Sequence, residues 1–125
     1  MHALVEFACV LLGGALGAVI RHLVSGSLAR LVGLSAWIAI IGVNTLGSIL
    51  AGVLVGVQLP VESTFMNALL LVGVCGGLTT FSTAMLDAWV LMATGRRWLG
   101  FCCLFGTPLL AMGGILLGRM IGGVT

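Results

Sequence analysis

The fold is decided by the stretch Cys75-Gly76-Gly77-Leu78-Thr79-Thr80-Phe81-Ser82-Thr83, which lies inside an apolar run from about Phe65 to Met92. Two adjacent glycines followed by hydroxyl residues suit the middle of a helix poorly, because glycine loses much backbone entropy there and hydroxyls compete for backbone hydrogen bonds. The stretch therefore predicts a break in an otherwise apolar helix. In lipid, the freed backbone groups need partners in protein or in a wet cavity. Such breaks often mark ion sites, with carbonyls for cations and half-helix N-termini for anions.

The composition indicates that the bilayer is the solvent of this chain. It has 125 residues, of which 61% are hydrophobic and 6% are charged, and its mean hydropathy is +1.33. A soluble domain of this size keeps a large surface in water and cannot bury so much apolar area. We therefore predict an all-α membrane protein with a single domain over residues 1–125. The net charge is only +2, and no basic patch indicates nucleic acid as a partner.

Charged and turn-forming residues divide the chain into four predicted membrane spans, each about as long as a bilayer needs. The spans lie at about 3–24, 36–57, 64–92 and 99–120, and the third contains the break. Arg21 to Gly33 is predicted as a polar connection, and Gln58 to Ser63 as a turn in which Pro60 stops one helix and Ser63 caps the next. Four spans place both termini on one side. The arginine tally differs too little between the two sides to exclude insertion in both orientations.

Four short helices have too little perimeter to enclose a wet path, so we expect a homo-oligomer. Small-residue faces that allow close backbone approach are expected to supply its interfaces. These faces are Gly13, Gly14 and Gly17 in the first span and Gly113, Gly114 and Gly118 in the fourth. If two copies met in opposite orientations, their breaks could face each other at mid-depth, where four carbonyls could hold a small hard cation such as Na⁺.

The chemistry of an enzyme is missing from the sequence. There is no nucleophile paired with a base, no phosphate-binding loop and no cluster of metal ligands. The four cysteines lie in apolar runs without metal-ligand spacing, which favours buried free thiols over a metal site or a disulfide. They are Cys9, Cys75, Cys102 and Cys103.

Over nearly its whole length the chain resembles the Fluc (CrcB) family of bacterial fluoride channels. The resemblance is carried by four stretches: Gly13 to Arg21, Gly42-Val43-Asn44-Thr45-Leu46-Gly47-Ser48, Gly76 to Thr83, and Gly114 to Gly118. It implies an antiparallel, dual-topology homodimer in the inner (plasma) membrane of a bacterium. It also implies passive fluoride export that lowers cytoplasmic fluoride, with a structural Na⁺ at the dimer interface. By position, that Na⁺ is held by the backbone carbonyls of Gly76 and Thr79.

The resemblance also implies roles for individual side chains along the fluoride path. Asn44 matches the asparagine that lines it, and Phe81 matches a phenylalanine whose ring edge contacts fluoride. Ser82 and Thr83 match the hydroxyl pair beside that ring. The remaining matches are Thr107, in the polar track of the fourth span, and Arg21, in the vestibule at the end of the first span.

Each of these side chains also has an ordinary structural interpretation. Asn44 by itself could bond a neighbouring helix, and Phe81 could pack in a core. Membrane hydroxyls often bond back to the preceding turn. Arg21 by itself would be an arginine that reaches the membrane interface.

Departures from the family pattern leave alternatives open. The position three residues after Phe81 is Ala84 rather than a second phenylalanine. In the fourth span, Cys103 and Ala111 stand where many members have a tyrosine and a serine. The chain is therefore also compatible with one half of a heterodimeric pair. A small multidrug transporter is disfavoured, because its mechanism needs a carboxylate deep in the membrane and the acidic residues here lie near span ends.

Overall fold

The computed structural model describes residues 1–57 and 64–123, and these form long helices with no strand. α1 runs from His2 to Leu31, α2 from Ala36 to Gly56 and α6 from Arg97 to Ile121. The third span is made of the short α3 (Thr64–Met66), a π-helical segment (Asn67–Cys75), α4 (Gly76–Leu78) and α5 (Phe81–Ala93). The fold-class prediction of four membrane helices with a broken third is confirmed.

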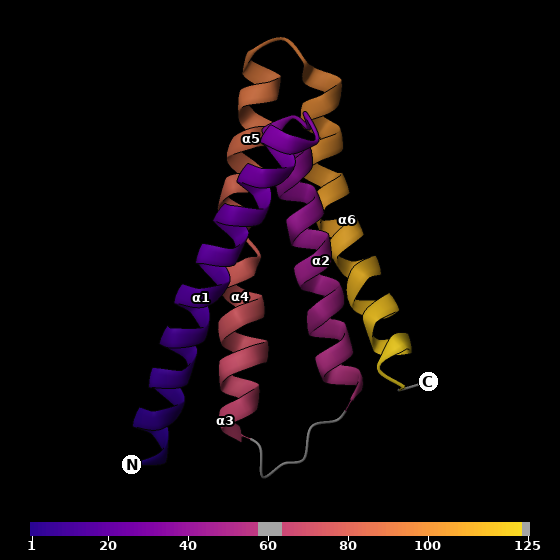
Figure 1. Ribbon diagram of the computed structural model, residues 1–125. Helices are drawn as coiled ribbons and strands as arrows, with labels where there is room; N and C mark the ends of the chain where they lie inside the picture. Colours follow the sequence, from indigo (N-terminus) through magenta and orange to yellow (C-terminus); the bar gives the residue numbers. More distant parts are fainter. Residues whose placement is uncertain (58–63, 124–125) are drawn as a thin grey trace.

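The four spans alternate in direction, so that both termini lie at the same end of the molecule (Figure 1). The chain turns tightly at the other end, where Gly33 and Gly95 adopt left-handed backbone conformations (φ +69° and +85°) that glycine tolerates without strain. The predicted turn with Pro60 and Ser63 lies outside the described residues.

The first connection differs from the prediction. Arg21 to Leu31 continues α1 as regular helix, and only residues 32–35 connect it to α2. Arg21 therefore lies within a helix with several turns beyond it. The hydroxyl of Ser25 donates to the Arg21 carbonyl (2.7 Å), so this polar residue satisfies itself inside the helix.

The helices pack in pairs, and glycines decide the closest approaches. α1 lies against the π-helical segment and α4, while α6 lies against both α2 and α5. A Cβ at Gly13 would overlap the Leu69 carbonyl oxygen, and a Cβ at Gly118 would overlap that of Ile49. The small-residue faces are thus largely used inside one protomer, which corrects the expectation that they supply the interface between copies.

The break lies inside the predicted stretch, at Thr79 and Thr80, whereas Gly76 and Gly77 within that stretch remain helical. The physical reason lies in packing, because a Cβ at Gly77 would overlap the Gly14 carbonyl oxygen of α1. Gly77 therefore serves close helix contact, whereas a Cβ at Gly76 would meet nothing within 4 Å.

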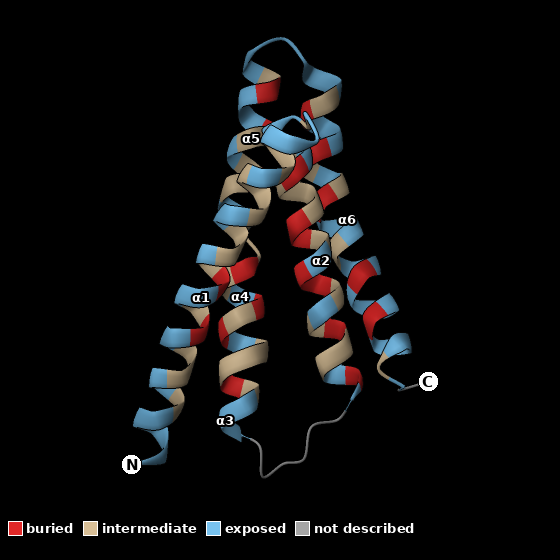
Figure 2. Ribbon diagram, viewed as in Figure 1, coloured by how far each residue is buried: buried red, intermediate tan, exposed pale blue. Residues whose placement is uncertain are grey.

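Most of the outer surface of the four helices is exposed and apolar, while buried residues line their contacts (Figure 2). Exposed leucine, phenylalanine and tryptophan side chains cover all four spans. In a bilayer this surface faces lipid chains, so its exposure is the expected state of a membrane protein.

Candidate functional site

The interruption of the third span consists of two extended residues, Thr79 and Thr80, which we call the break. Thr79 has φ −87° and ψ 153°, and Thr80 has φ −149° and ψ 118°. The Thr79 N–H still donates to the Cys75 carbonyl (3.1 Å), so the helical ladder reaches Thr79 and stops there. Beyond this point the peptide groups have lost their helical partners. They need other ones, because lipid offers none.

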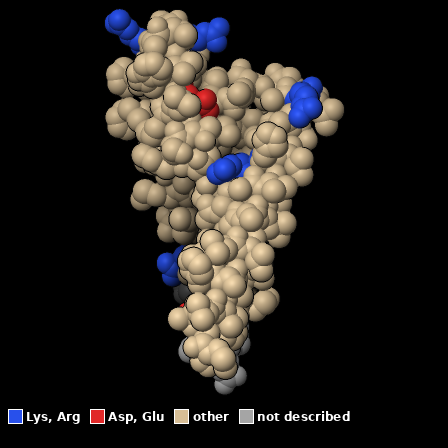
Figure 3. Space-filling view, turned by 90° about the vertical axis from the view of Figure 1, so that its left-hand side faces the viewer, with Lys and Arg blue, Asp and Glu red and all other residues tan. Residues whose placement is uncertain are grey.

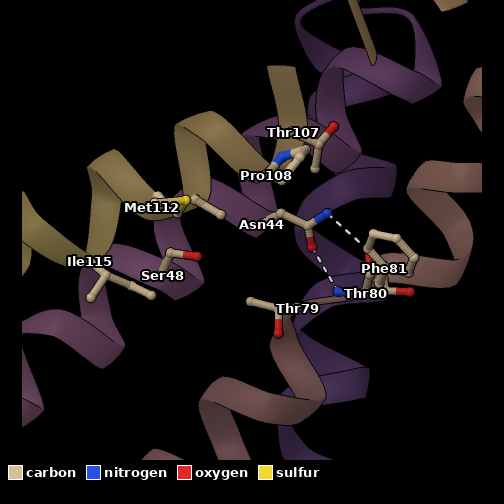
Figure 4. Close-up of a pocket in the computed structure, with 10 residues that line it drawn as sticks. Asn44, Ser48, Thr79, Thr80, Phe81, Thr107, Pro108, Met112 and Ile115 are labelled. Atoms are coloured by element: carbon tan, nitrogen blue, oxygen red, sulfur yellow. Dashed lines mark hydrogen bonds between the residues drawn. The ribbon is translucent and has the colours of Figure 1, made fainter. Parts of the chain in front are cut away.

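Asn44 of α2 supplies a partner for the freed Thr80 N–H and makes a second bond to the same residue. Its side-chain Oδ1 accepts from the Thr80 N–H (2.7 Å), and its Nδ2 donates to the Thr80 carbonyl (3.0 Å) (Figure 4). Asn44 is buried, with 4% of its surface exposed. The amide therefore bonds a neighbouring helix, which is the ordinary structural interpretation of this residue, and it does so at the break.

Arg21 of α1 supplies a partner for a second freed group, the Thr79 carbonyl. Its Nη1 donates to the Thr79 carbonyl (3.1 Å) across 58 positions of sequence. The guanidinium thus lies against the broken backbone of the third span. The Thr79 carbonyl is also one of the two that the family resemblance assigns to Na⁺, so Arg21 and a bound cation would share this oxygen.

The hydroxyls around the break form a short network. Thr80 is the N-cap of α5, and its Oγ1 accepts from the Thr83 N–H (3.3 Å). The same hydroxyl donates to the Thr83 Oγ1 (3.1 Å) and lies 3.4 Å from the Ser82 Oγ. Because Thr83 accepts in this contact, its own proton remains available to a ligand. The break thus leads directly into a capped helix N-terminus at membrane depth.

A groove of about 290 Å³ opens beside the break, between α2, α5 and α6 (Figure 4). Asn44, Thr79, Phe81 and Thr107 line it, so these predicted site residues come together from three spans. Its other lining residues are Ser48, Thr80, Pro108, Ala111, Met112 and Ile115. A smaller groove of about 190 Å³ adjoins it and includes Gly76 with Thr79 and Ser48. Ser82, Thr83 and Arg21 line neither groove.

Two of the groove residues differ in the freedom of their side chains. The Thr107 hydroxyl donates to the Cys103 carbonyl (2.7 Å), the back-bond expected of a membrane threonine. Its proton is therefore used within α6. Phe81 is the opposite case, because 71% of its side chain is exposed in the protomer and its ring edge is accessible.

Ala84 lies at a sealed contact between α5 and α6. Both Ala84 and Cys103 are fully buried, and the Cys103 thiol donates to the Ala84 carbonyl (3.5 Å). The two helices therefore meet closely here, and no side chain from position 84 reaches the groove.

Thr80 and Ser48 are part of the site but were not among the predicted site residues. A signal for Thr80 was present in the sequence, because a threonine before an apolar helical run is a preferred N-cap. Ser48 follows Asn44 by one helical turn, which places both on one face of α2. The four-residue spacing from Asn44 is therefore the sequence signal for Ser48 as a site residue.

The charged groups are few and scattered. Figure 3 shows isolated basic side chains separated by wide uncharged areas on the face that it presents. Among the described residues, no three or more histidine, cysteine or carboxylate side chains gather as they would around a metal ion.

Comparison with known proteins finds one family model and several similar proteins that cover most of the chain. Residues 8–119 match the family described as CrcB-like protein, Camphor Resistance (CrcB). The chain is 33% identical to a fluoride-specific ion channel FluC of Maridesulfovibrio salexigens, over 93% of this chain and 97% of the relative. It is 37% identical to the FluC channel of Hahella chejuensis, over 90% and 93% of the two chains. The FluC channel of Pseudoalteromonas translucida is 40% identical over 70% and 74%.

Proposed function

The chain belongs to the CrcB family, and from this premise we propose that the break and its groove form part of the path of a fluoride channel. The protein is a multi-pass bacterial membrane protein and an ion channel, not an enzyme. The observation that carries the assignment to this site is the start of α5 at Phe81, inside the third span and at the edge of the groove.

A helix N-terminus at membrane depth suits a small anion. The first N–H groups of a helix have no intrahelical acceptor, and the helix dipole makes this end positive. In α5, Thr80 takes the Thr83 N–H, which leaves those of Phe81 and Ser82 without a partner in their own helix. Fluoride is strongly hydrated, so a path for it must replace water with such donors while still allowing release.

Side chains extend this set of donors. The Ser82 hydroxyl is exposed, and the Thr83 hydroxyl proton has no acceptor among the described residues. The rim of the Phe81 ring carries the positive part of its quadrupole, a weak contact that favours fast release of an anion. Thr107 also lines the groove, but it is not a donor there, because its hydroxyl donates to the Cys103 carbonyl.

The direction of transport follows from the membrane potential. HF is neutral, crosses membranes and dissociates in the less acidic cytoplasm, where F⁻ is trapped. An inside-negative potential drives F⁻ outward through a selective path, at about 2.3 kcal/mol per charge for 100 mV. The channel thus lowers cytoplasmic fluoride without coupling to another solute.

We propose that the functional unit is an antiparallel homodimer with a structural Na⁺ at its centre. One protomer leaves the groove open on one side, and a second copy would close it. The backbone carbonyls of Gly76 and Thr79 fit the role of hard oxygen ligands. A Cβ at Gly76 would meet nothing within 4 Å, so the backbone there is accessible to a partner.

The test is F⁻ efflux from liposomes that contain only this protein, with valinomycin to set the potential and an electrode to record F⁻. We expect rapid efflux of F⁻ but not of Cl⁻, and slower efflux for the variant Phe81→Ile. Replacing Na⁺ by a large organic cation should slow efflux if the central ion is required. A folded dimer that passes no F⁻ would contradict a self-sufficient channel and would favour the heterodimeric alternative, for which Ala84 is the motivating observation.

A further inference from the structure

We propose that Asn44 is a positioning residue, which together with Arg21 holds the third span in its broken form and fixes where α5 begins. Its amide acts through the Thr80 peptide, to which both of its heavy atoms are bonded. The effect of this role on conduction rests on the proposed function, whereas the role itself concerns only the protein backbone.

The Asn44 amide is largely occupied by the Thr80 peptide. Both heavy atoms of the amide bond one residue, since Oδ1 accepts from the Thr80 N–H and Nδ2 donates to the Thr80 carbonyl. An amide has one acceptor oxygen and two N–H donors. Two of these three groups are therefore engaged in the protomer without any ion.

If the third span continued as one helix, the Thr80 N–H would donate to the Gly76 carbonyl, and the Thr79 carbonyl would accept from the Thr83 N–H. The break removes both bonds. Asn44 accepts from the Thr80 N–H instead, and Arg21 donates to the Thr79 carbonyl. Because an unpaired peptide group in lipid is costly, these two side chains favour the broken form over the continuous one.

The break is joined directly to the groove through the start of α5. Thr80 is also the N-cap of α5, so holding its peptide determines where that helix starts. Phe81 follows directly and lines the groove. Displacing the Thr80 peptide would move the helix N-terminus and the Phe81 ring together.

The test measures the backbone of the break without fluoride. The protein carries ¹³C,¹⁵N-labelled threonine and is reconstituted as the full-length chain in bilayers, and the Cα and Cβ shifts of Thr79 and Thr80 are recorded. These shifts separate extended from helical backbone. We expect extended values in the wild type, and in Asn44→Ala a movement of both residues toward helical or averaged values.

Ser48→Ala is the matched control, because Ser48 lies one turn along α2, lines the same groove and has no hydrogen bond to the break. Its threonine shifts should remain those of the wild type. If Asn44→Ala does not fold, Asn44→Asp carries the test. An ionised carboxylate keeps the acceptor for the Thr80 N–H but cannot donate to the Thr80 carbonyl, so a smaller movement in the same direction is expected.

Unchanged Thr79 and Thr80 shifts in a folded Asn44 variant would overturn the proposal. A change spread evenly over all threonines would also overturn it, since that would indicate a general loss of packing. F⁻ efflux measured on the same samples keeps the two hypotheses apart. A wild type with an extended break but no F⁻ flux would contradict the channel proposal alone.

Discussion

At the scale of single residues, the site depends on a small number of bonds that join distant parts of the chain. Arg21, Asn44 and Thr80 are far apart in sequence, and they meet at two peptide groups. Thr80 takes part twice, through its peptide and through its hydroxyl. Disturbing the bond to the Thr80 peptide and removing the Thr80 hydroxyl should therefore have separate, measurable effects.

The variant Thr80→Val tests the hydroxyl alone. Valine has nearly the same shape and keeps the peptide bonded to Asn44, but it removes the acceptor for the Thr83 N–H. Losing a side-chain N-cap typically costs about 1 kcal/mol. We expect a loss of this size in the free energy of unfolding, measured by titration with a denaturing detergent, together with slower F⁻ efflux.

Thr45→Val is the matched control, because the Thr45 hydroxyl only bonds back to the Ile41 carbonyl of its own helix (2.9 Å). It should change the free energy of unfolding by a few tenths of a kcal/mol at most. Equal losses of unfolding free energy in Thr80→Val and Thr45→Val would show that the N-cap bond of Thr80 does not stabilise the protein.

The position of the break could be predicted from the sequence, whereas its hydrogen-bond partners could not. The motif at positions 76–83 located the break to within a few residues, because glycine and hydroxyl side chains have recognisable backbone preferences. The partners of the break could not be derived in the same way. That Asn44 would bond Thr80 depends on how α2 crosses the third span, and a span pattern does not contain this crossing.

At the scale of helices, glycines control how closely the spans approach. In α6, Gly118 is buried against Ile49 and Gly52 of α2, whereas a Cβ added at Gly113 would meet nothing within 4 Å. The sequence presented both glycines as parts of one small-residue face. Only the packed structure separates the one in contact from the one that is open.

Gly118→Ala should therefore force α2 and α6 apart. The new methyl group would overlap backbone atoms that cannot move independently, and overpacking of this kind typically costs about 1–3 kcal/mol. We expect a loss of that order in the free energy of unfolding. Gly113→Ala adds the same methyl group to the same helix without a clash, so it should leave stability unchanged or raise it slightly. Similar losses in both variants would contradict the assigned packing.

The contact between α5 and α6 allows a second prediction at this scale. A phenylalanine at position 84 would restore the family pattern, but Ala84 is fully buried against Cys103. Ala84→Phe should therefore destabilise the protomer by about 1–3 kcal/mol or more, because the ring has no space between the helices. Thermal unfolding in detergent would measure it. Leu86→Phe, at a position of the same helix that is 58% exposed, is the control and should unfold like the wild type.

At the scale of the whole molecule, the composition alone was enough to predict the four apolar spans. Apolar length and the charges between spans are properties of the linear sequence, and they predicted the four helices. The extension of α1 to Leu31 was missed, because Arg21, Ser25 and Arg30 gave that segment the composition of a loop. In the structure these polar side chains bond back to their own helix or to the break, and so permit helix to continue.

The orientation of the molecule in the membrane follows from where the arginines lie. Arg21 is bonded to the Thr79 carbonyl, so it belongs to the packed spans and does not count as a loop charge. This leaves Arg30, Arg96 and Arg97 at one end and Arg119 at the other. Such a difference gives little preference under the positive-inside rule. We therefore predict that the chain inserts in both orientations.

Cysteine labelling of intact cells measures this directly. Ser35→Cys places a thiol at the end of the molecule with the tight turns, and His2→Cys places one at the end with the termini; both positions are exposed. With a membrane-impermeant maleimide, each variant should be labelled to about half of the extent reached after permeabilisation, because the two orientations would be equally populated. The wild type is the blank, since its four cysteines lie inside the spans. Full labelling of one variant and none of the other would establish a single orientation, and an antiparallel pair of identical chains could then not form.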